Sequence, residues 1–213
     1  IINTFILRVF MKTFKEYLLE EQSKLDKIYA KAPEAKKEIS SIGKDIAAKV
    51  GGFYIDGGIK SKQRSKEKVE KEYDGDESKL KDVVRGTVAV DKKDYETAKE
   101  LLEPHSTQLK QHKGNSSPLG YSGVNSHIKT DAGIHGEIQV NTPEMIYAKE
   151  KPSDAKRMLG IKMYNDIKNM MGPAGKGHEY YEKWRSAEDG SPEKKQIEKT
   201  CKKYYSKIRD KIK

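Results

Sequence analysis

One segment of the chain carries a row of cations that could bind a polyphosphate. Lys60, Arg64 and Lys68 recur every four residues, so they would stack on one face of a helix predicted over residues 59–72, with Lys62 beside them. Like charges at this spacing repel each other, whereas a polyphosphate lying across the face would let several cations share one anionic ligand. A solvated basic face, softened by neighbouring glutamates, explains the same pattern.

Asp82 directly precedes a β-branched segment, residues 83–90, that we expect to form a strand. A carboxylate at the mouth of a sheet could hold a hard cation through its oxygen atoms, and it could equally be a cap. Arg85 follows three residues later, where it could clamp a phosphate or be an ordinary surface arginine.

Two further positions have the residue types of a nucleotide site. Tyr121 lies in the sequence Gly-Tyr-Ser-Gly, whose small residues let a flat base approach and stack on the ring. In a strand predicted over residues 135–140, Glu137 and Gln139 share one face while their neighbours enter the core. The same alternation is typical of any half-solvated strand.

Spacing weighs against several familiar catalytic sites. Lys60 lies two residues too late for the phosphate loop G-x-x-x-x-G-K-[ST], and neither H-E-x-x-H nor G-x-S-x-G occurs. Individual histidines such as His127 and His178 are, by themselves, typical of structural or surface positions.

Because Cys201 is the single cysteine, the chain can form neither a disulfide framework nor a cysteine-based zinc site, which favours a reducing, cytoplasmic compartment.

The overall composition favours a polyanionic partner. The 213 residues suit one domain, and 43 Lys and Arg against 33 Asp and Glu leave a net charge of +10. Such an excess is typical of proteins that bind nucleotides or RNA, or of a lysine-rich solvated surface. No apolar run approaches the roughly 20 residues that cross a bilayer, so we predict no membrane span.

Hydrophobic periodicity predicts the elements that would position these residues. Pro33 is expected to begin the second of two N-terminal helices. Strands are predicted at 53–55, 83–90, 121–129 and 135–140, the last two as a hairpin, and helices at 13–30, 33–50, 95–102, 143–169, 178–185 and 191–213.

The chain divides, on this pattern, into four parts. Residues 1–10 precede Met11 and could be an extension, 11–50 would form N-terminal helices, and 51–186 would form the main domain. The last part, 190–213, would be a basic helix with a narrow apolar stripe.

Taken in order, these motifs resemble the RelA/SpoT synthetase domain. The match consists of the Lys60 to Lys68 segment, Asp82 before Val-Val-Arg-Gly-Thr, Gly120-Tyr121, Glu-Ile-Gln-Val-Asn-Thr from Glu137, and Gly-His-Glu-Tyr-Tyr from Gly177. The similarity is greatest to compact members found among phage and toxin proteins, and it covers roughly residues 50–182. Longer members usually have serine where Arg64 stands and histidine where Asn125 stands.

The resemblance implies an α+β fold with a central mixed sheet of four or five strands flanked by helices. It also implies a Mg²⁺-dependent transfer of the β,γ-pyrophosphate of ATP to the 3′-hydroxyl of a nucleotide, releasing AMP. By resemblance, Asp82 and Glu137 would hold Mg²⁺, Glu137 would accept the hydroxyl proton with support from Gln139, and Tyr121 would stack on the acceptor base. The remaining nucleotide-binding candidates are Lys60, Lys62, Arg64, Lys68, Arg85, Asn125 and His178.

A guanosine nucleotide, GDP or GTP, is the acceptor that the resemblance implies first. An alternative acceptor is the 3′ CCA end of tRNA, which the basic helix at 190–213 could hold through its backbone phosphates. A different class of function, a nucleotide- or RNA-binding protein without catalysis or a structural phage component, also fits the sequence.

Overall fold

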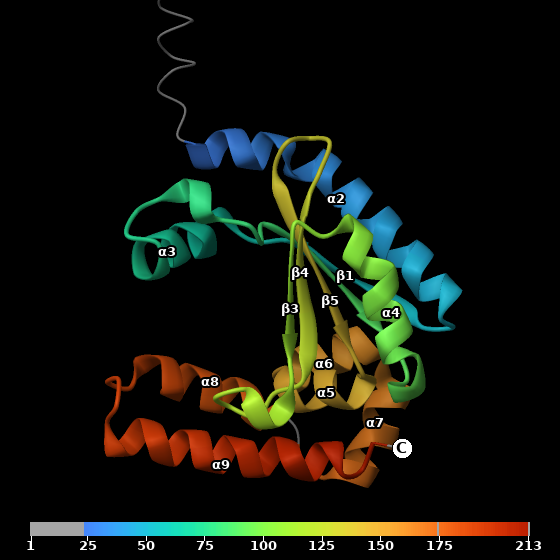
Figure 1. Cartoon of the computed structure of the whole chain (residues 1–213), viewed down its shortest axis with the longest axis vertical. Coiled ribbons are helices and arrows are strands. Elements are labelled where there is room, and N and C mark those ends of the chain that lie inside the picture. Colours follow the sequence, from blue (N-terminus) through green and yellow to red (C-terminus); the bar gives the residue numbers. More distant parts are fainter. Residues whose placement is uncertain (1–23, 174, 213) are drawn as a thin grey trace, which may run out of the picture.

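A mixed five-stranded sheet forms the centre of the computed structural model, which describes residues 24–173 and 175–212. The strands lie in the order β1-β2-β5-β4-β3 (Figure 1). They are β1 (Phe53–Ile59), β2 (Val84–Ala89), β3 (Gln108–His112), β4 (Gly123–Lys129) and β5 (His135–Asn141). The predicted extension at 1–10 and the first part of the predicted helix at 13–30 lie outside the described residues.

The strand pairing confirms the expected α+β fold with a mixed sheet. β2 and β5 are parallel, whereas β1 with β2, β4 with β5 and β3 with β4 are antiparallel. β4 and β5 form the predicted hairpin. The sequence pattern does not predict β3, because this edge strand is polar apart from Leu109 and lacks an apolar face.

Helices α2 (Lys24–Lys49) and α4 (Tyr95–Leu102) cover one face of the sheet. Ile39 of α2 packs in the same buried cluster as Val88 and Ile138 of the strands. This face therefore carries the apolar core, and the alternate residues of the strands are left for the opposite face.

The prediction of two N-terminal helices meeting at Pro33 is wrong. Pro33 lies inside α2 on its exposed side, and the buried stripe continues through Ala32 and Ala35 to Ile46. Proline removes one backbone hydrogen bond within a helix. Burial of a continuous apolar stripe against the sheet outweighs that loss and keeps the helix whole.

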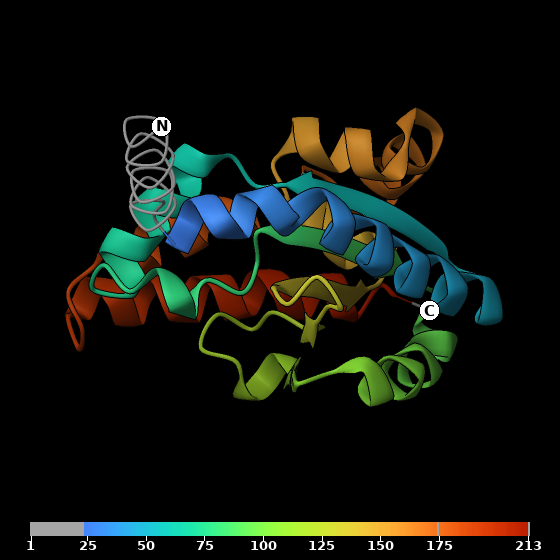
Figure 2. The same ribbon diagram turned by 90° about the horizontal axis from the view of Figure 1, so that it is seen from above.

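The remaining helices lie on the other side of the sheet or at its end. Figure 1 shows α2 and α4 on one side of the strands and α3 and α8 on the other. In Figure 2, α6 and α7 lie beside the β1 edge, and α4 lies beside the β3 edge. These helices are α3 (Lys62–Glu72), α5 (Pro143–Lys149), α6 (Pro152–Leu159), α7 (Ile161–Met171), α8 (Lys176–Ser186) and α9 (Pro192–Arg209), with 3₁₀ turns at Glu77–Lys79, Lys92–Asp94, Glu103–His105 and Gly114–Ser116.

The predicted basic C-terminal helix is confirmed as α9, and it packs into a buried cluster of its own. Cys201, Tyr205 and Ile208 of α9 are buried with Met145 and Ala148 of α5. None of the helices in the described part of the chain has the length and apolarity needed to cross a membrane.

Strand β1 is longer than the predicted strand at 53–55, and its extra length places Lys60 outside the predicted helix. Pairing with β2 passes through a bulge between Asp56 and Gly58, where Gly58 has a φ of 71° that glycine adopts readily. α3 begins only after Ser61, whose hydroxyl accepts the backbone N–H of Arg64 as an N-cap. Lys60 thus lies between strand and helix, so the predicted row of three cations on one helix face is wrong.

Candidate active site

The polar face of the sheet brings most of the candidate residues into two cross-strand rows. Arg85 on β2, Glu137 on β5 and His127 on β4 are aligned in the first row. In the second row, Gln139 is aligned with Asn125 on one side and Thr87 on the other. Because side chains alternate along each strand, both rows point away from the core that α2 and α4 cover.

Asp82 is the centre of a buried ion cluster at the end of β2. The Asp82 side chain is 11% exposed, and its Oδ2 accepts hydrogen bonds from the Lys60 and Lys68 ammonium groups, the latter at 3.0 Å. The Lys60 main chain is fixed by its N–H donating to Val83 and by its carbonyl accepting the Tyr29 hydroxyl at 2.6 Å. Lys60 and Lys68, two candidate phosphate ligands, therefore contact Asp82, the candidate metal ligand.

The charges in this cluster depend on one another. Burial by itself would raise the pKa of Asp82, but the two lysines outweigh it and hold the pKa of the carboxyl below its usual range. Burial lowers the pKa of Lys60 more than Asp82 raises it, whereas Asp82 raises the pKa of Lys68 despite burial. Two cations share the Asp82 carboxylate, with Glu72 Oε2 3.9 Å from the Lys68 Nζ, and two lysines gathered at one buried carboxylate are suited to bind further negative charge.

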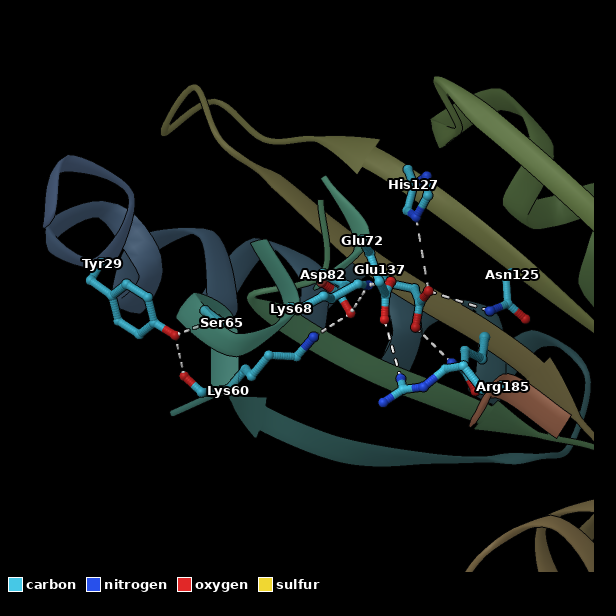
Figure 3. Close-up of polar contacts among 11 residues, drawn as sticks. Tyr29, Lys60, Ser65, Lys68, Glu72, Asp82, Asn125, His127, Glu137 and Arg185 are labelled. Atoms are coloured by element: carbon cyan, nitrogen blue, oxygen red, sulfur yellow. Dashed lines mark hydrogen bonds and ion pairs between the residues drawn. The ribbon is translucent and has the colours of Figure 1, made fainter. Parts of the chain in front are cut away.

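Asp82 and Glu137 lie on the same polar face although 55 positions separate them in the sequence. Glu137 is 7% exposed, so both carboxylates are buried. Burial lowers the pKa of His127, and the negative charges of Glu137 and Asp82 both oppose that shift, so the imidazole senses both carboxylates. Figure 3 draws the two carboxylates with separate sets of contacts, Asp82 with the lysines and Glu137 with Asn125 and His127.

Glu137 is held by hydrogen bonds from its own face. The Gln139 Nε2 donates to Glu137 Oε1 at 2.6 Å, and the Asn125 Nδ2 donates to Oε2 at 3.3 Å. His127 Nε2 lies 3.9 Å from the same Oε2. On its other side Gln139 accepts a hydrogen bond from Lys149, a residue that the sequence motifs do not single out.

Four buried polar atoms of this region have no hydrogen-bond partner within the described part of the chain. They are Asp82 Oδ1, Arg85 Nε, Asn125 Oδ1 and Asn141 Nδ2. An unsatisfied buried polar group costs about 1–3 kcal/mol, and such groups are rare in folded proteins. Their concentration on the polar face is typical of a site that a polar ligand completes.

The donor set fits Mg²⁺. Asp82 Oδ1 and Glu137 are hard oxygen donors, and Mg²⁺ is commonly bound by one or two carboxylates together with substrate phosphates. Among the residues that the structure describes, no group of three or more Asp, Glu, His or Cys gathers as an all-protein metal cage. A shared ion between protein and polyphosphate is the arrangement that this donor set supports.

Tyr121 is packed between the sheet and the C-terminal helices. Its hydroxyl donates to Asn141 Oδ1 at 2.5 Å, and its ring centroid lies 5.5 Å from that of His112 and 5.7 Å from the Lys149 Nζ. The ring is thereby fixed near the second row of polar residues. Stacking on a base remains a prediction for this residue.

Some nucleotide-binding candidates lie away from the cluster. Lys62 pairs with Asp26 of α2, and Arg64 is exposed on the first turn of α3, so neither joins Lys60 and Lys68 around Asp82. Because α3 begins at Lys62, Lys60 reaches Asp82 from the end of β1 and not from the helix that carries Lys68. His178 lies in the first turn of α8, where it is half-buried.

An ion pair joins the two helices that flank the polar face. Arg185 Nη1 of α8 lies 3.2 Å from Glu72 Oε1 of α3, and Figure 3 draws this pair together with the site residues. The sequence gives no signal for it, because the two residues are 113 positions apart and belong to different predicted elements.

The sequence and the structure are both similar to the same known protein. No family model matches the chain. The chain is 44% identical over 185 residues to the (p)ppApp synthetase toxin Tas1 of Pseudomonas aeruginosa (strain UCBPP-PA14), and the match covers 86% of this chain and 42% of that protein. The chain thus spans less than half the length of this curated relative.

Two solved structures are similar to the chain to very different degrees. The crystal structure of the complex between the Type VI effector Tas1 and its immunity protein matches at 44% identity with a TM-score of 0.82, covering 87% of this chain and 96% of that chain. The small alarmone synthetase 1 from Bacillus subtilis matches at 14% identity and a TM-score of 0.48, covering 88% and 95% of the two chains. The second similarity is too weak to support an argument about function.

Proposed function

The chain belongs to the toxin-type alarmone synthetases, and from that premise we propose that it transfers the pyrophosphate of ATP to the 3′-hydroxyl of an adenosine nucleotide. The observation that carries the proposal is a buried carboxylate, Glu137, on the same polar face as the cluster of Asp82, Lys60 and Lys68. Phosphoryl-type transfer needs positioning and charge neutralisation rather than a protein nucleophile. Such a site supplies both.

In the proposed reaction, the 3′-oxygen of the acceptor attacks the β-phosphorus of ATP. A bond forms between this oxygen and the β-phosphorus, the bond from the β-phosphorus to the oxygen bridging it to the α-phosphate breaks, and AMP leaves. Glu137 takes the proton of the hydroxyl. Hydrogen bonds from Gln139 and Asn125 would hold the Glu137 carboxylate in place for that transfer.

Lys60, Lys68 and Arg85 are the proposed phosphate ligands. Two lysines already share the Asp82 carboxylate, and the Arg85 Nε is buried without a partner among the described residues, so an incoming polyphosphate would satisfy all three. Asp82 and Glu137 would hold Mg²⁺, which when bound would neutralise charge on the transferred group. We therefore expect ATP to bind at the end of the sheet next to α3.

The proposed adenosine acceptor replaces the guanosine nucleotide implied by the sequence motifs. The name of the relative Tas1 gives an adenosine product, (p)ppApp, and offers no support for GDP or GTP. Tyr121 presents a ring that could stack on either purine. Asn125, where longer RelA/SpoT members have histidine, is a difference near this part of the site.

Two macromolecular partners are proposed as well. The relative Tas1 forms a complex with an immunity protein, and we propose a corresponding protein inhibitor for this chain. A tRNA acceptor stays open as an alternative because Lys195, Lys199, Lys203 and Lys207 are exposed at four-residue intervals along α9.

The test is a labelled-ATP assay with the purified chain. γ-labelled ATP and Mg²⁺ are incubated in turn with AMP, ADP, GDP, GTP and deacylated tRNA, and both AMP release and label in the acceptor are measured. Label in adenosine nucleotides at a rate at least about 10²-fold above that of a Glu137→Gln variant supports the proposal. Label only in guanosine nucleotides or tRNA overturns the adenosine acceptor, and no transfer with any acceptor overturns the enzymatic function.

A further inference from the structure

Lys149, the last residue of α5, contacts two separate parts of the candidate site. Its Nζ donates to Gln139 Oε1 at 2.8 Å and lies 5.7 Å from the centroid of the Tyr121 ring. It also pairs with Glu150 Oε1 at 3.0 Å, and its side chain is only 24% exposed. A lysine in this position connects the proposed acceptor-base ring with the residues around Glu137.

The contact with Lys149 fixes which way the Gln139 carboxamide faces. An ammonium group has only donors, so Gln139 must turn its oxygen toward Lys149 and therefore its nitrogen toward Glu137. The structure has this arrangement, with Gln139 Nε2 at 2.6 Å from Glu137 Oε1. In the opposite orientation, the Gln139 oxygen would face a carboxylate oxygen and leave Glu137 without this donor.

The surroundings keep Lys149 in the form that donates. Burial would lower its pKa, but Tyr121, Glu150 and Glu137 together raise the pKa above its usual value. The ammonium thus retains all its protons at neutral pH and holds Gln139 in one orientation.

We propose that Lys149 is a positioning residue of the pyrophosphate transfer, which orients Gln139, and through it Glu137, from a position against the Tyr121 ring. This inference rests on the proposed function. It gives α5 a part in the chemistry, because the last residue of this helix donates a hydrogen bond to Gln139 of β5. Lys149 acts through Gln139 and does not itself touch the reacting atoms.

The test compares Lys149→Met with the wild-type chain. Methionine is unbranched like lysine but one atom shorter, and it removes the donors, so kcat is expected to fall about 10- to 100-fold, the range for losing a hydrogen bond that orients a charged group. The KM for ATP is expected to stay within about twofold, because the phosphate ligands are untouched. Lys149→Arg, which keeps a cationic donor, should restore most of kcat, and Lys151→Met, at an exposed lysine two residues along, should match the wild type.

A double-mutant cycle shows whether Lys149 acts through Gln139. Gln139→Met should lower kcat by a similar factor, and the double variant should be no slower than the slower single variant. Independent losses that multiply in the double variant would overturn the relay, and so would a Lys149→Met enzyme with wild-type kcat. If Lys149→Met lowers kcat/KM only by raising the KM for ATP, with kcat unchanged, the residue is a substrate ligand and the proposal is wrong.

A second measurement does not depend on turnover or on the proposed function. The ¹⁵N resonance of the Gln139 side-chain amide, assigned by its loss in Gln139→Met, is expected to shift in Lys149→Arg and more strongly in Lys149→Met. An unchanged resonance in folded variants would overturn the orientation by Lys149, even if the wild-type chain transfers no pyrophosphate. If Lys149→Met does not fold, Lys149→Gln replaces it in both measurements, with a smaller loss of kcat expected because glutamine keeps a neutral donor.

Discussion

Replacing Asp82 by asparagine tests whether the lysine cluster is a phosphate site. The Asp82 carboxylate is buried, and its Lys60 and Lys68 partners have side chains 8% and 24% exposed. Removing one partner of a fully buried ion pair costs about 3–5 kcal/mol, and the partial exposure of Lys68 reduces this to about 2–3 kcal/mol. For a chain of this size, that corresponds to a fall in Tm of about 4–12 °C.

The pH dependence of this loss has a defined sign. Because the pKa of Asp82 is lowered in the folded state, the unfolded chain binds more protons as the pH falls below about 4, and stability falls with it. The difference in unfolding free energy between the wild type and Asp82→Asn should be complete near pH 7. It should shrink as the pH drops through the pKa of the folded state.

The assay is thermal unfolding with and without inorganic tripolyphosphate. In Asp82→Asn, Lys60 loses the Asp82 carboxylate and, within the described part of the chain, Lys68 keeps only its 3.9 Å ion pair with Glu72, so the polyanion should raise the Tm of the variant more than that of the wild type. Asp166→Asn is the matched control, since Asp166 forms a 3.2 Å pair with Lys162 on the surface, with side chains 63% and 94% exposed, and should cost at most about 1 kcal/mol. Equal or smaller stabilisation of Asp82→Asn by tripolyphosphate would refute the assignment of Lys60 and Lys68 to phosphate.

Three further outcomes are expected. Glu137→Gln should lower the rate of AMP formation at least about 10²-fold with little change in the KM for ATP, and a loss below tenfold would contradict its role as proton acceptor. Gly177→Ala should cost about 1–3 kcal/mol in urea unfolding, because the new Cβ would lie 2.1 Å from the Tyr205 hydroxyl, and a neutral effect would contradict this packing. Burial raises the pKa of Cys201 to about 12, so iodoacetamide at pH 8 should label the thiol only after denaturation; fast labelling of the native chain would show that α9 opens.

The sequence predicts the strands of the site better than its helices. Glu137, Gln139 and Arg85 lie on one sheet face as alternation requires, because a strand has a period of two and its buried neighbours are plainly apolar. The contacts of Asp82 with Lys60 and Lys68 are seen only in the structure, because the motifs name these residues without placing them together. The roles of these residues in binding and catalysis stay predictions.

Each error of the sequence-based prediction has a physical cause. Lys60 falls outside α3 because a glycine bulge prolongs β1, and periodicity of four in a lysine-rich segment does not show where a helix begins. Pro33 is tolerated within α2 because the helix packs on the sheet, a tertiary effect that local propensity does not contain. No sequence motif indicates the proposed role of Lys149, because that role depends on a contact between α5 and β5 that forms only in the folded chain.

Because β2 pairs with β5 in parallel, Asp82 and Glu137 should come together only late in folding. Residues 84–89 and 136–141 can align only after the intervening chain, including α4 and the β3–β4 segment, has closed a long loop. Such non-local contacts are slow to form. The proposed transfer activity should therefore return only with the final cooperative step of refolding, and a partly folded chain that is rich in helix should not catalyse the transfer.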